Sequence, residues 1–168
     1  HSFHALLETF PEDNLAGATE DISVHMAFIC MLHLANEHGL KITTEQQLGL
    51  IKEAGYTTII NLAPKSHENA LGNEDELLQA LGIRYFHLPV VFTNPTRDDF
   101  ERFIETFESC DDERVWVHCA ANMRVSAFFY KYRVERLGWS EESAKADMDK
   151  IWEPGKVMGV WQSFIEEA

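Results

Sequence analysis

Short β-branched runs alternate with helical patterns along most of the chain. The runs "TTIINL" (57–62), "IRYFHLPVV" (83–91) and "RVWVH" (114–118) have the length and composition of buried strands. Helical patterns precede, separate and follow them, at residues 44–55, 73–82, 96–107, 124–137 and 140–152. Because strands joined through helices pair in parallel by right-handed crossovers, this order predicts an α/β fold with a mainly parallel central sheet flanked by helices.

Residues at the helix boundaries support this assignment. Side chains able to cap a helix stand at the predicted beginnings: Thr44, with Gln47 closing a capping box, Asn73, Thr96 and Ser140. After Thr96, four apolar residues recur at the i, i+3, i+4 and i+7 spacing of one core-facing side: Phe100, Phe103, Ile104 and Phe107. The segment 124–137 is apolar nearly all round, which predicts a central, covered helix. A last helical piece is expected at 157–165, and the tryptophans nearby are interpreted as packing residues.

The charge of the chain limits its partners. We expect a single domain over residues 1–168, with about residues 1–21 as an amino-terminal extension. The formal net charge of −14 opposes binding to nucleic acid or to anionic membranes.

The longest strongly apolar run, residues 26–35, is far shorter than the roughly 20 residues of a membrane-spanning helix, so a soluble protein is predicted. The chain begins at His1, so we expect an upstream segment to be absent, and the sequence decides neither the compartment, cytoplasmic or periplasmic, nor the oligomeric state.

The cysteines and histidines give no metal site. The chain has three cysteines: Cys30, Cys110 and Cys119. Their number and spacing exclude a disulfide framework and a zinc cluster, and His25, His33 and His38 lack ligand spacing, so neither a metal nor another cofactor is predicted. Cys30 and Cys110 are interpreted as small buried hydrophobic side chains. Cys119 differs because it follows the third predicted strand, at the sheet edge where α/β proteins bind ligands.

The six residues "CAANMR" (119–124) reverse the chain between the third strand and the next helix. A turn this short aims successive backbone N–H groups into one concavity at the positive end of the helix, and such a nest binds anions. The same dipole and the nearby Arg124 favour the thiolate of Cys119 over the thiol, and a thiolate is a nucleophile. We therefore expect an anion such as phosphate or sulfate in this loop, beside a reactive sulfur.

The segment "VHCAANMRVSAF" resembles the signature of the cysteine-dependent, dual-specificity-like protein phosphatase superfamily: a strand ending in His-Cys, a phosphate-binding loop, an arginine and a helix. The segments "KEAGYTTIINL", "GIRYFHLPV" and "GWSEESAKADMDKIWEP" extend the likeness over roughly residues 22–165. They resemble a bacterial, largely uncharacterised branch that is also found fused to β-lactamase-like hydrolases. The resemblance implies a protein-tyrosine-phosphatase-like fold and a phosphatase that hydrolyses a phosphate monoester.

The resemblance also implies roles for individual residues. Cys119 is expected to attack phosphorus and form a phosphocysteine, Arg124 to hold the phosphate oxygens, and an aspartate to protonate the leaving group. The expected phosphate-binding set consists of Ala120, Ala121, Asn122, Met123, Arg124 and Val125. His118 is expected to orient the loop by hydrogen bonding, or else to be a buried strand histidine. Ser126 is expected to donate a hydrogen bond to the Cys119 sulfur, or else to cap the helix.

The spacing between Cys119 and Arg124 departs from the superfamily pattern, which has five intervening residues where this chain has four. Matching the arginines shortens the loop, which then resembles the six-residue loop of rhodanese-like sulfurtransferases, carriers of a persulfide. Matching Ser126 to the usual Ser or Thr keeps the normal length and puts Val125 at the usual arginine position. It also puts Asn122 at a glycine position, and Asn is the non-glycine residue most able to take a positive φ. We favour this second alignment.

The general acid of the superfamily is expected after the strand "YFHLP", where this chain has "VVFTN" (90–94) and no carboxylate. Asp98 is the candidate acid, although Asp98 and Asp99 stand in the first turn of a predicted helix, where carboxylates usually serve the helix N-terminus. A missing acid lowers the rate by roughly 10²- to 10⁴-fold without preventing anion binding. Three hypotheses stay open: a phosphatase for a phosphorylated substrate of undetermined class, a sulfurtransferase with a Cys119 persulfide, and a catalytically weak phosphate-binding module.

Overall fold

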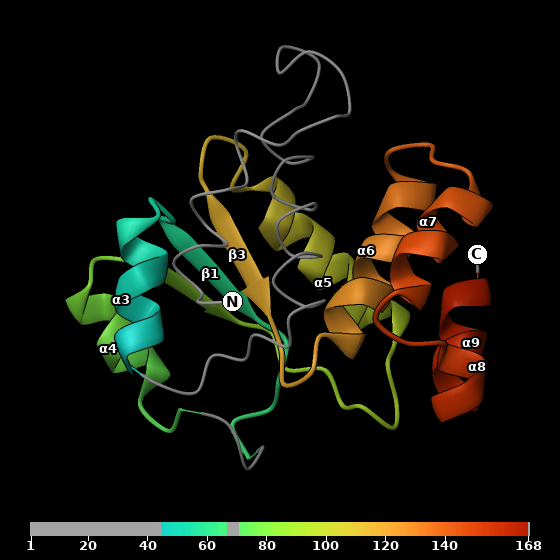
Figure 1. Ribbon diagram of the computed structural model, residues 1–168, viewed down its shortest axis with the longest axis horizontal. Helices are drawn as coiled ribbons and strands as arrows, with labels where there is room; N and C mark the ends of the chain where they lie inside the picture. Colours follow the sequence, from blue (N-terminus) through green and yellow to red (C-terminus); the bar gives the residue numbers. More distant parts are fainter. Residues whose placement is uncertain (1–44, 67–70, 168) are drawn as a thin grey trace.

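The computed structural model describes residues 45–66 and 71–167. Its elements follow in this order: α3 (Glu45–Glu53), β1 (Thr58–Asn61), α4 (Glu74–Ala80), β2 (Arg84–His87), α5 (Arg97–Glu108), β3 (Val115–His118), α6 (Met123–Glu135), α7 (Glu141–Asp149), α8 (Pro154–Val157) and α9 (Gly159–Glu166). Figure 1 shows them coloured along the chain. No helix in these two ranges is long and apolar enough to cross a bilayer.

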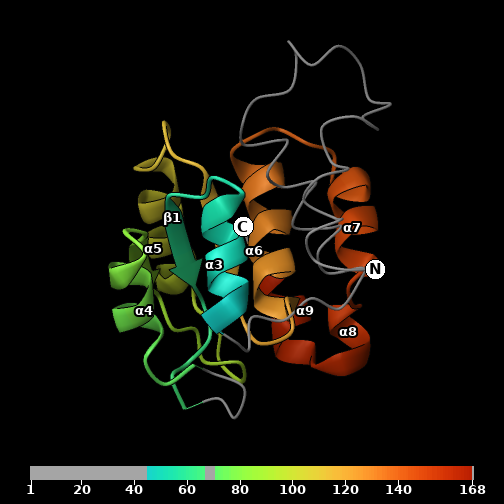
Figure 2. The same ribbon diagram turned by 60° about the vertical axis from the view of Figure 1, so that its left-hand side comes forward.

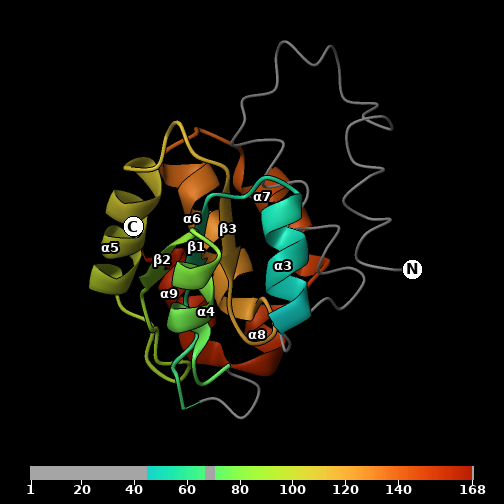
Figure 3. The ribbon, with the colours of Figure 1, turned by 90° about the vertical axis from the view of Figure 1, so that its left-hand side faces the viewer.

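The described strands form one parallel sheet in the order β2, β1, β3. Ile59 of β1 lies in register with Tyr85 of β2 and with Trp116 of β3. All of β1 is buried, as expected for the centre of a parallel sheet that is covered on both faces. Helices α3 and α4 lie on one side of the sheet and α5 and α6 on the other (Figure 1 and Figure 3). The predicted α/β fold with a mainly parallel, helix-flanked sheet is confirmed.

Helix α6 is the centre of the helical layer beside the sheet. Residues 124–133 are all buried, and α7 and α9 pack against the helix (Figure 2). From the α5 side, the rings of Phe100 and Phe103 meet Phe128 edge to face, each with 5.5 Å between ring centroids. Pairs of this kind contribute about 0.5–1.5 kcal/mol each beyond their buried area. The prediction of a central, covered helix is confirmed, and so is the buried apolar face of α5.

The helix starts match the predictions in part. Thr96 forms a full capping box with Asp99, and the Ser140 hydroxyl accepts from a backbone N–H one turn along α7. The predicted side-chain cap at Asn73 is wrong, because within the described ranges this side chain makes no capping hydrogen bond. The predicted cap Thr44 lies outside the described residues.

The carboxyl-terminal piece consists of two helices, α8 and α9, where one was expected at 157–165. Met158 between them is extended, with φ −156° and ψ 108°, and this interrupts the helix. Pro154 takes the first position of α8, where a helix does not need the missing N–H. Trp161 of α9 is fully buried, 5.8 Å from Trp152 between ring centroids, which confirms both as packing residues.

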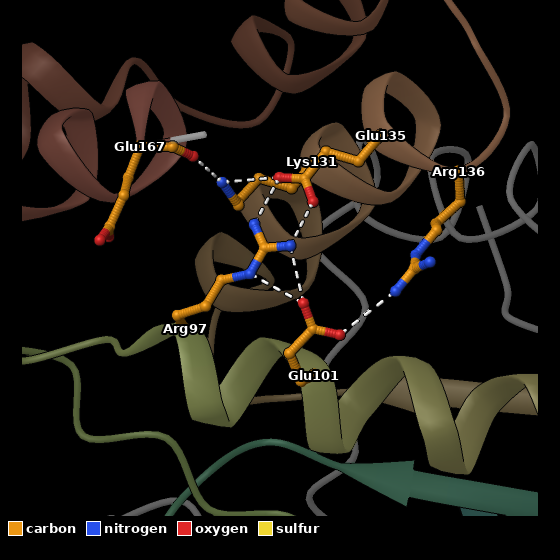
Figure 4. A network of polar contacts seen from close by, with 6 residues as sticks. All are labelled: Arg97, Glu101, Lys131, Glu135, Arg136 and Glu167. Atoms are coloured by element: carbon orange, nitrogen blue, oxygen red, sulfur yellow. Dashed lines mark hydrogen bonds and ion pairs between the residues drawn. The ribbon is translucent and has the colours of Figure 1, made fainter.

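A buried lysine ties α6 to the end of α9 (Figure 4). The Lys131 side chain is 2% exposed, and its ammonium lies 2.8 Å from the Glu135 carboxylate and donates to the backbone carbonyl of Glu167. Two aromatic rings face the same ammonium at 5.6 and 5.3 Å, those of Phe100 and Phe164. A cation over aromatic faces is stabilised most where water is excluded.

The network continues to α5 through Glu135. Arg97 lies 2.8 Å from Glu135 and 2.7 Å from Glu101, and Arg136 reaches the second oxygen of Glu101 at 3.2 Å. Burial alone would raise the pKa of Glu135, but the hydrogen bonds and charges of Lys131 and Arg97 lower it overall. The charged form of Glu135 is therefore the one that the folded protein stabilises.

Replacing Lys131 with Met keeps the length of the side chain and removes the ammonium. Because the Glu167 carbonyl and one side of Glu135 then lose their donor, we expect the free energy of unfolding at pH 7 to fall by about 2 kcal/mol in urea denaturation. The matched control is Lys145→Met, which removes an exposed pair with Asp149 and should cost less than about 0.5 kcal/mol. Equal losses in the two variants would contradict this role of the buried ammonium.

Candidate functional site

Three strands end together at one edge of the sheet. β1 ends at Asn61, β2 at His87 and β3 at His118, and these residues are side by side in the parallel register. Cys119 follows His118 directly, so it lies at this edge, as the sequence predicts. In Figure 1 the chain turns beyond the tip of β3 and returns as α6.

The turn between β3 and α6 spans residues 119–122. Asn122 has φ 59° and ψ 0°, the left-handed conformation, and it is the one non-glycine residue with positive φ in the described ranges. This conformation is the one that the second alignment requires, because that alignment puts Asn122 at a glycine position of the superfamily loop. Ala120 is half-buried, Ala121 is exposed and Asn122 is buried, so the turn is open to solvent near its middle.

The amino terminus of α6 has no side-chain cap. Asn122 makes no capping hydrogen bond, and the first bond within the helix runs from Ser126 N to Asn122 O at 2.9 Å. The backbone N–H groups of Met123, Arg124 and Val125 therefore have no acceptor within the helix. By contrast, α5 and α7 are both capped by a hydroxyl. An uncapped 13-residue helix that begins at a short loop presents its positive end to that loop.

The two described cysteines differ in access. The Cys119 side chain is half-buried at the mouth of the turn. Cys110 is 1% exposed, its thiol donates to Thr106 O at 3.2 Å, and burial raises its pKa. The interpretation of Cys110 as a buried structural thiol is confirmed, whereas Cys30 lies outside the described residues.

Arg124 connects the first turn of α6 to the segment after β2. Its side chain is buried, Nε donates to Val90 O at 2.9 Å, and the guanidinium lies 5.0 Å from the centroid of the Phe92 ring. Among the described residues, neither terminal nitrogen of Arg124 has a protein acceptor. The guanidinium is thus oriented by its Nε side while its other side retains donors for a ligand.

Val125 and Ser126 continue α6 into the core. Val125 is 1% exposed, so at the usual arginine position this chain has a core side chain and offers only its backbone N–H to the loop. The Ser126 hydroxyl donates to Met123 O and accepts from Trp152 Nε1, each at 3.0 Å. Because a hydroxyl has one hydrogen, this arrangement has no donor for the Cys119 sulfur. The hydroxyl therefore takes neither of the two roles expected for Ser126, a donor to the sulfur or a helix cap, and instead bonds within the first turn of α6.

The segment after β2 is held in place by two side chains and carries no carboxylate. Besides Arg124, the indole of Trp161 donates to Phe92 O at 2.7 Å. The Asp99 carboxylate accepts from Thr96 in the capping box and pairs with Arg102, so it stabilises the start of α5. Asp98 is exposed in the first turn of α5.

A buried carboxylate that the sequence analysis missed lies next to His118. Glu74, the first residue of α4, is 7% exposed in its side chain, and its Oε1 lies 2.9 Å from His118 Nε2, an ion pair by distance rather than a well-aligned hydrogen bond. Its Oε2 accepts from Asn61 Nδ2 at 2.7 Å and from Tyr85 OH at 2.8 Å. Burial alone would raise the pKa of Glu74, but His118, Tyr85 and Asn61 together lower it. In the sequence Glu74 is one of three consecutive acidic residues at a helix start, and no spacing distinguishes it from its exposed neighbours.

The first residues of the chain resemble a protein of a different family. Residues 1–52 match the profile of a family described as condensin complex subunit 2. Over 48 residues the chain is 54% identical to condensin complex subunit 2 of Arabidopsis thaliana, a stretch that covers 28% of this chain and 7% of that protein. Nearly all of this stretch lies outside the described residues.

The rest of the chain resembles phosphatases. Residues 33–159 match a family described as "DSP-PTPase phosphatase fused to NAD+ Kinase". A candidate phosphatase of Shewanella putrefaciens is 32% identical, with 74% of this chain and 80% of that chain covered at a TM-score of 0.66. Two further structures share the fold at lower identity. TpbA of P. aeruginosa, bound to phosphotyrosine, is 17% identical over 74% of this chain and 75% of its own, at a TM-score of 0.59. The catalytic core of the phosphatase SIW14 of S. cerevisiae, bound to citrate, is 18% identical over 70% of each chain, at a TM-score of 0.57.

The family match spans residues 33–159, which include the three described strands and the turn after β3. The protein-tyrosine-phosphatase-like fold that the sequence resemblance implies is confirmed. The chain therefore belongs to the DSP-PTPase family, within the superfamily of cysteine-dependent, dual-specificity-like protein phosphatases.

Proposed function

We propose that this protein hydrolyses a phosphate monoester through a phosphocysteine formed on Cys119. The observation that carries the proposal is the turn itself: a half-buried thiol at its start, a left-handed Asn122 at its end, and an uncapped helix beyond it. Together these features would direct backbone donors and a nucleophile toward one bound anion. The relatives supply the reaction class, since the family is one of phosphatases.

The phosphate would be held by the backbone N–H groups of residues 120–125. Those of Met123, Arg124 and Val125 have no acceptor within α6, so an anion can take their place as acceptor. The helix dipole adds a favourable contribution of about 0.3–1 kcal/mol for each negative charge at this end. Donors fixed on a buried helix need little rearrangement as charge builds up on the phosphoryl oxygens.

Arg124 would complete the phosphate site through its two terminal nitrogens. Its Nε stays bonded to Val90 O, and the ring of Phe92 lies against the guanidinium, so the side chain is already ordered before a ligand arrives. An ordered guanidinium loses less entropy on binding than a mobile one and can contact two oxygens at once. Val125, at the usual arginine position, would contribute only backbone.

The reaction has two steps. The Cys119 thiolate attacks phosphorus, the bond from phosphorus to the ester oxygen breaks, and the alcohol leaves with a proton from a general acid. Water then attacks the phosphocysteine, the bond between phosphorus and sulfur breaks, and inorganic phosphate leaves as the thiolate is restored. The register of the loop, with Asn122 at the glycine position, favours this chemistry over the persulfide chemistry of the shorter sulfurtransferase loop.

Replacing Cys119 with Ser removes the nucleophile and keeps the loop. We expect turnover of p-nitrophenyl phosphate to fall to background, while Cys110→Ser, at the buried thiol, keeps activity within about twofold of wild type. Mass spectrometry of rapidly quenched wild type should show the added mass of one phosphoryl group on Cys119. Turnover that survives Cys119→Ser, or a gain of one sulfur atom from thiosulfate without any phosphatase activity, would contradict the proposal.

Asp98 is proposed as the general acid because it is the exposed carboxylate that follows the β2 segment, whereas Asp99 serves the capping box. Asp98→Asn should lower kcat for an alkyl phosphate by roughly 10²-fold and have a much smaller effect on p-nitrophenyl phosphate, whose leaving group needs no proton. The matched control is Asp112→Asn, an exposed carboxylate between α5 and β3 that loses the same charge. Equal rates for the two variants on the alkyl phosphate would exclude Asp98 from this role.

The left-handed Asn122 is proposed to hold the donors in place. Asn122→Gly accepts this conformation without strain, whereas Asn122→Val opposes it by about 1–2 kcal/mol or more because Val is β-branched. The inhibition constant of inorganic phosphate should therefore stay within about twofold of wild type in the Gly variant and rise about tenfold in the Val variant. The comparison is made between proteins of equal stability in urea. Similar inhibition constants for all three proteins would show that the turn does not shape the anion site.

A further inference from the structure

Val91 exposes an apolar side chain in the segment after β2. The residue is 57% exposed, and the described ranges hold two other exposed large apolar residues, Leu137 and Val157. Leu137 follows the end of α6 that lies opposite the turn, and Val157 ends α8. Single exposed apolar residues are ordinary on protein surfaces, so exposure alone assigns no role to any of the three. Val91 differs from the other two in its neighbours.

Hydrogen bonds hold the backbone on both sides of Val91. Before it, the Val90 carbonyl accepts from Arg124 Nε at 2.9 Å. After it, the Phe92 carbonyl accepts from Trp161 Nε1 at 2.7 Å. A side chain on a backbone that is already ordered loses little further freedom when a ligand packs against it. Val91 is therefore a preorganised apolar contact.

The side chains before and after Val91 face the protein interior. Val90 is 1% exposed, and the Phe92 ring lies 5.5 Å from the ring of Trp161 between centroids. Arg124 contacts both of these residues, since its Nε bonds to the Val90 carbonyl and its guanidinium lies 5.0 Å from the centroid of the Phe92 ring. The exposed side chain of Val91 is thus at the rim of the site, next to the guanidinium.

A phosphate held in the turn would direct its leaving group toward this rim. The attacking atom and the leaving oxygen lie roughly in line on opposite sides of phosphorus, so the leaving group would point away from the Cys119 sulfur. Arg124 would hold oxygens between the two. The leaving group would then pass the segment after β2, where residues 90–94 offer the methyl groups of Val91 and no carboxylate.

We propose that Val91 is a specificity-determining residue: its side chain contacts the leaving group and selects phosphate monoesters that present an apolar surface, such as an aromatic ring, next to the ester oxygen. This inference rests on the proposed function in one respect, that the turn holds the phosphate. Each methylene-sized contact removed from water is worth about fourfold in affinity, whereas a hydroxyl or a charged group finds no hydrogen-bond partner in the side chain of Val91. The net charge of −14 acts in the same direction, because it repels a leaving group that carries further phosphates or carboxylates.

The test compares the binding of phenylphosphonate and methylphosphonate, two anions that cannot be hydrolysed, to the full-length protein by isothermal titration calorimetry. Val91→Thr keeps the shape of the side chain and exchanges one methyl group for a hydroxyl. We expect the preference for phenylphosphonate, taken as the ratio of the two dissociation constants, to fall about fourfold in Val91→Thr and about tenfold in Val91→Ala. Because the same ratio is compared between proteins, intrinsic differences between the two ligands cancel.

The matched control is Leu137→Asn, which makes an exposed apolar side chain polar with little change of shape at the opposite end of α6 from the turn. It should leave the preference within about twofold of wild type. If Val91→Thr weakens both phosphonates equally, if it leaves the preference unchanged, or if Leu137→Asn lowers the preference as far, the specificity role of Val91 is refuted.

The binding readout is independent of turnover. If wild type hydrolyses no phosphate monoester while Val91→Thr still lowers the preference, the proposed function fails and the contact with Val91 stands. If wild type hydrolyses p-nitrophenyl phosphate and the preference does not change, the proposed function stands and the role of Val91 fails. Binding of neither phosphonate by wild type would overturn the inference as well. In an active enzyme, Val91→Thr should lower kcat/KM for phenyl phosphate about fourfold more than for ethyl phosphate.

Discussion

The tight turn at residues 119–122 is the constraint on which the site depends. It joins a buried strand to a buried helix, with Val117 fully buried on one side and Val125 1% exposed on the other. Neither end can shift without opening the core, so four residues must reverse the chain, and a left-handed residue at position 122 makes this possible. The same reversal begins an uncapped helix, whose first backbone N–H groups have no acceptor within α6. The proposed anion site would thus be a consequence of connecting β3 to α6 by so short a path.

Distant parts of the chain hold this turn and its surroundings. Trp152, which precedes α8, donates to Ser126 in the first turn of α6, and Trp161 of α9 donates to Phe92 in the segment after β2. Arg124 is the third of these contacts, because its side chain donates a hydrogen bond from α6 to Val90 O in the segment after β2. The carboxyl-terminal helices therefore position two sides of the site, although neither contributes a side chain to the proposed reaction. Lys131 adds to this anchoring because it ties α6 to the end of α9.

The sequence predicted the parts of the site that depend on local pattern. A strand, Cys119 and an all-round apolar helix in direct succession predict a tight turn, and Asn122 is the residue in that turn most suited to a positive φ. The Glu74 cluster could not be predicted in the same way, because it joins residues from four elements whose neighbourhood depends on strand order. The missing side-chain cap at Asn73 and the extended Met158 between α8 and α9 were not predicted either, since local propensity is only a weak guide to such details.

The proposed anion site belongs to a protein that is strongly acidic overall, and the two are compatible because the electrostatic effects act at different ranges. The net charge of −14 repels a phosphate dianion at long range, and salt weakens this repulsion over a distance of about 8–10 Å. Inside the turn a bound anion would meet backbone dipoles and the Arg124 guanidinium at contact distance, where screening is weak. Short-range donors at the turn, rather than the net charge of the chain, are therefore what would allow an acidic protein to bind an anion there.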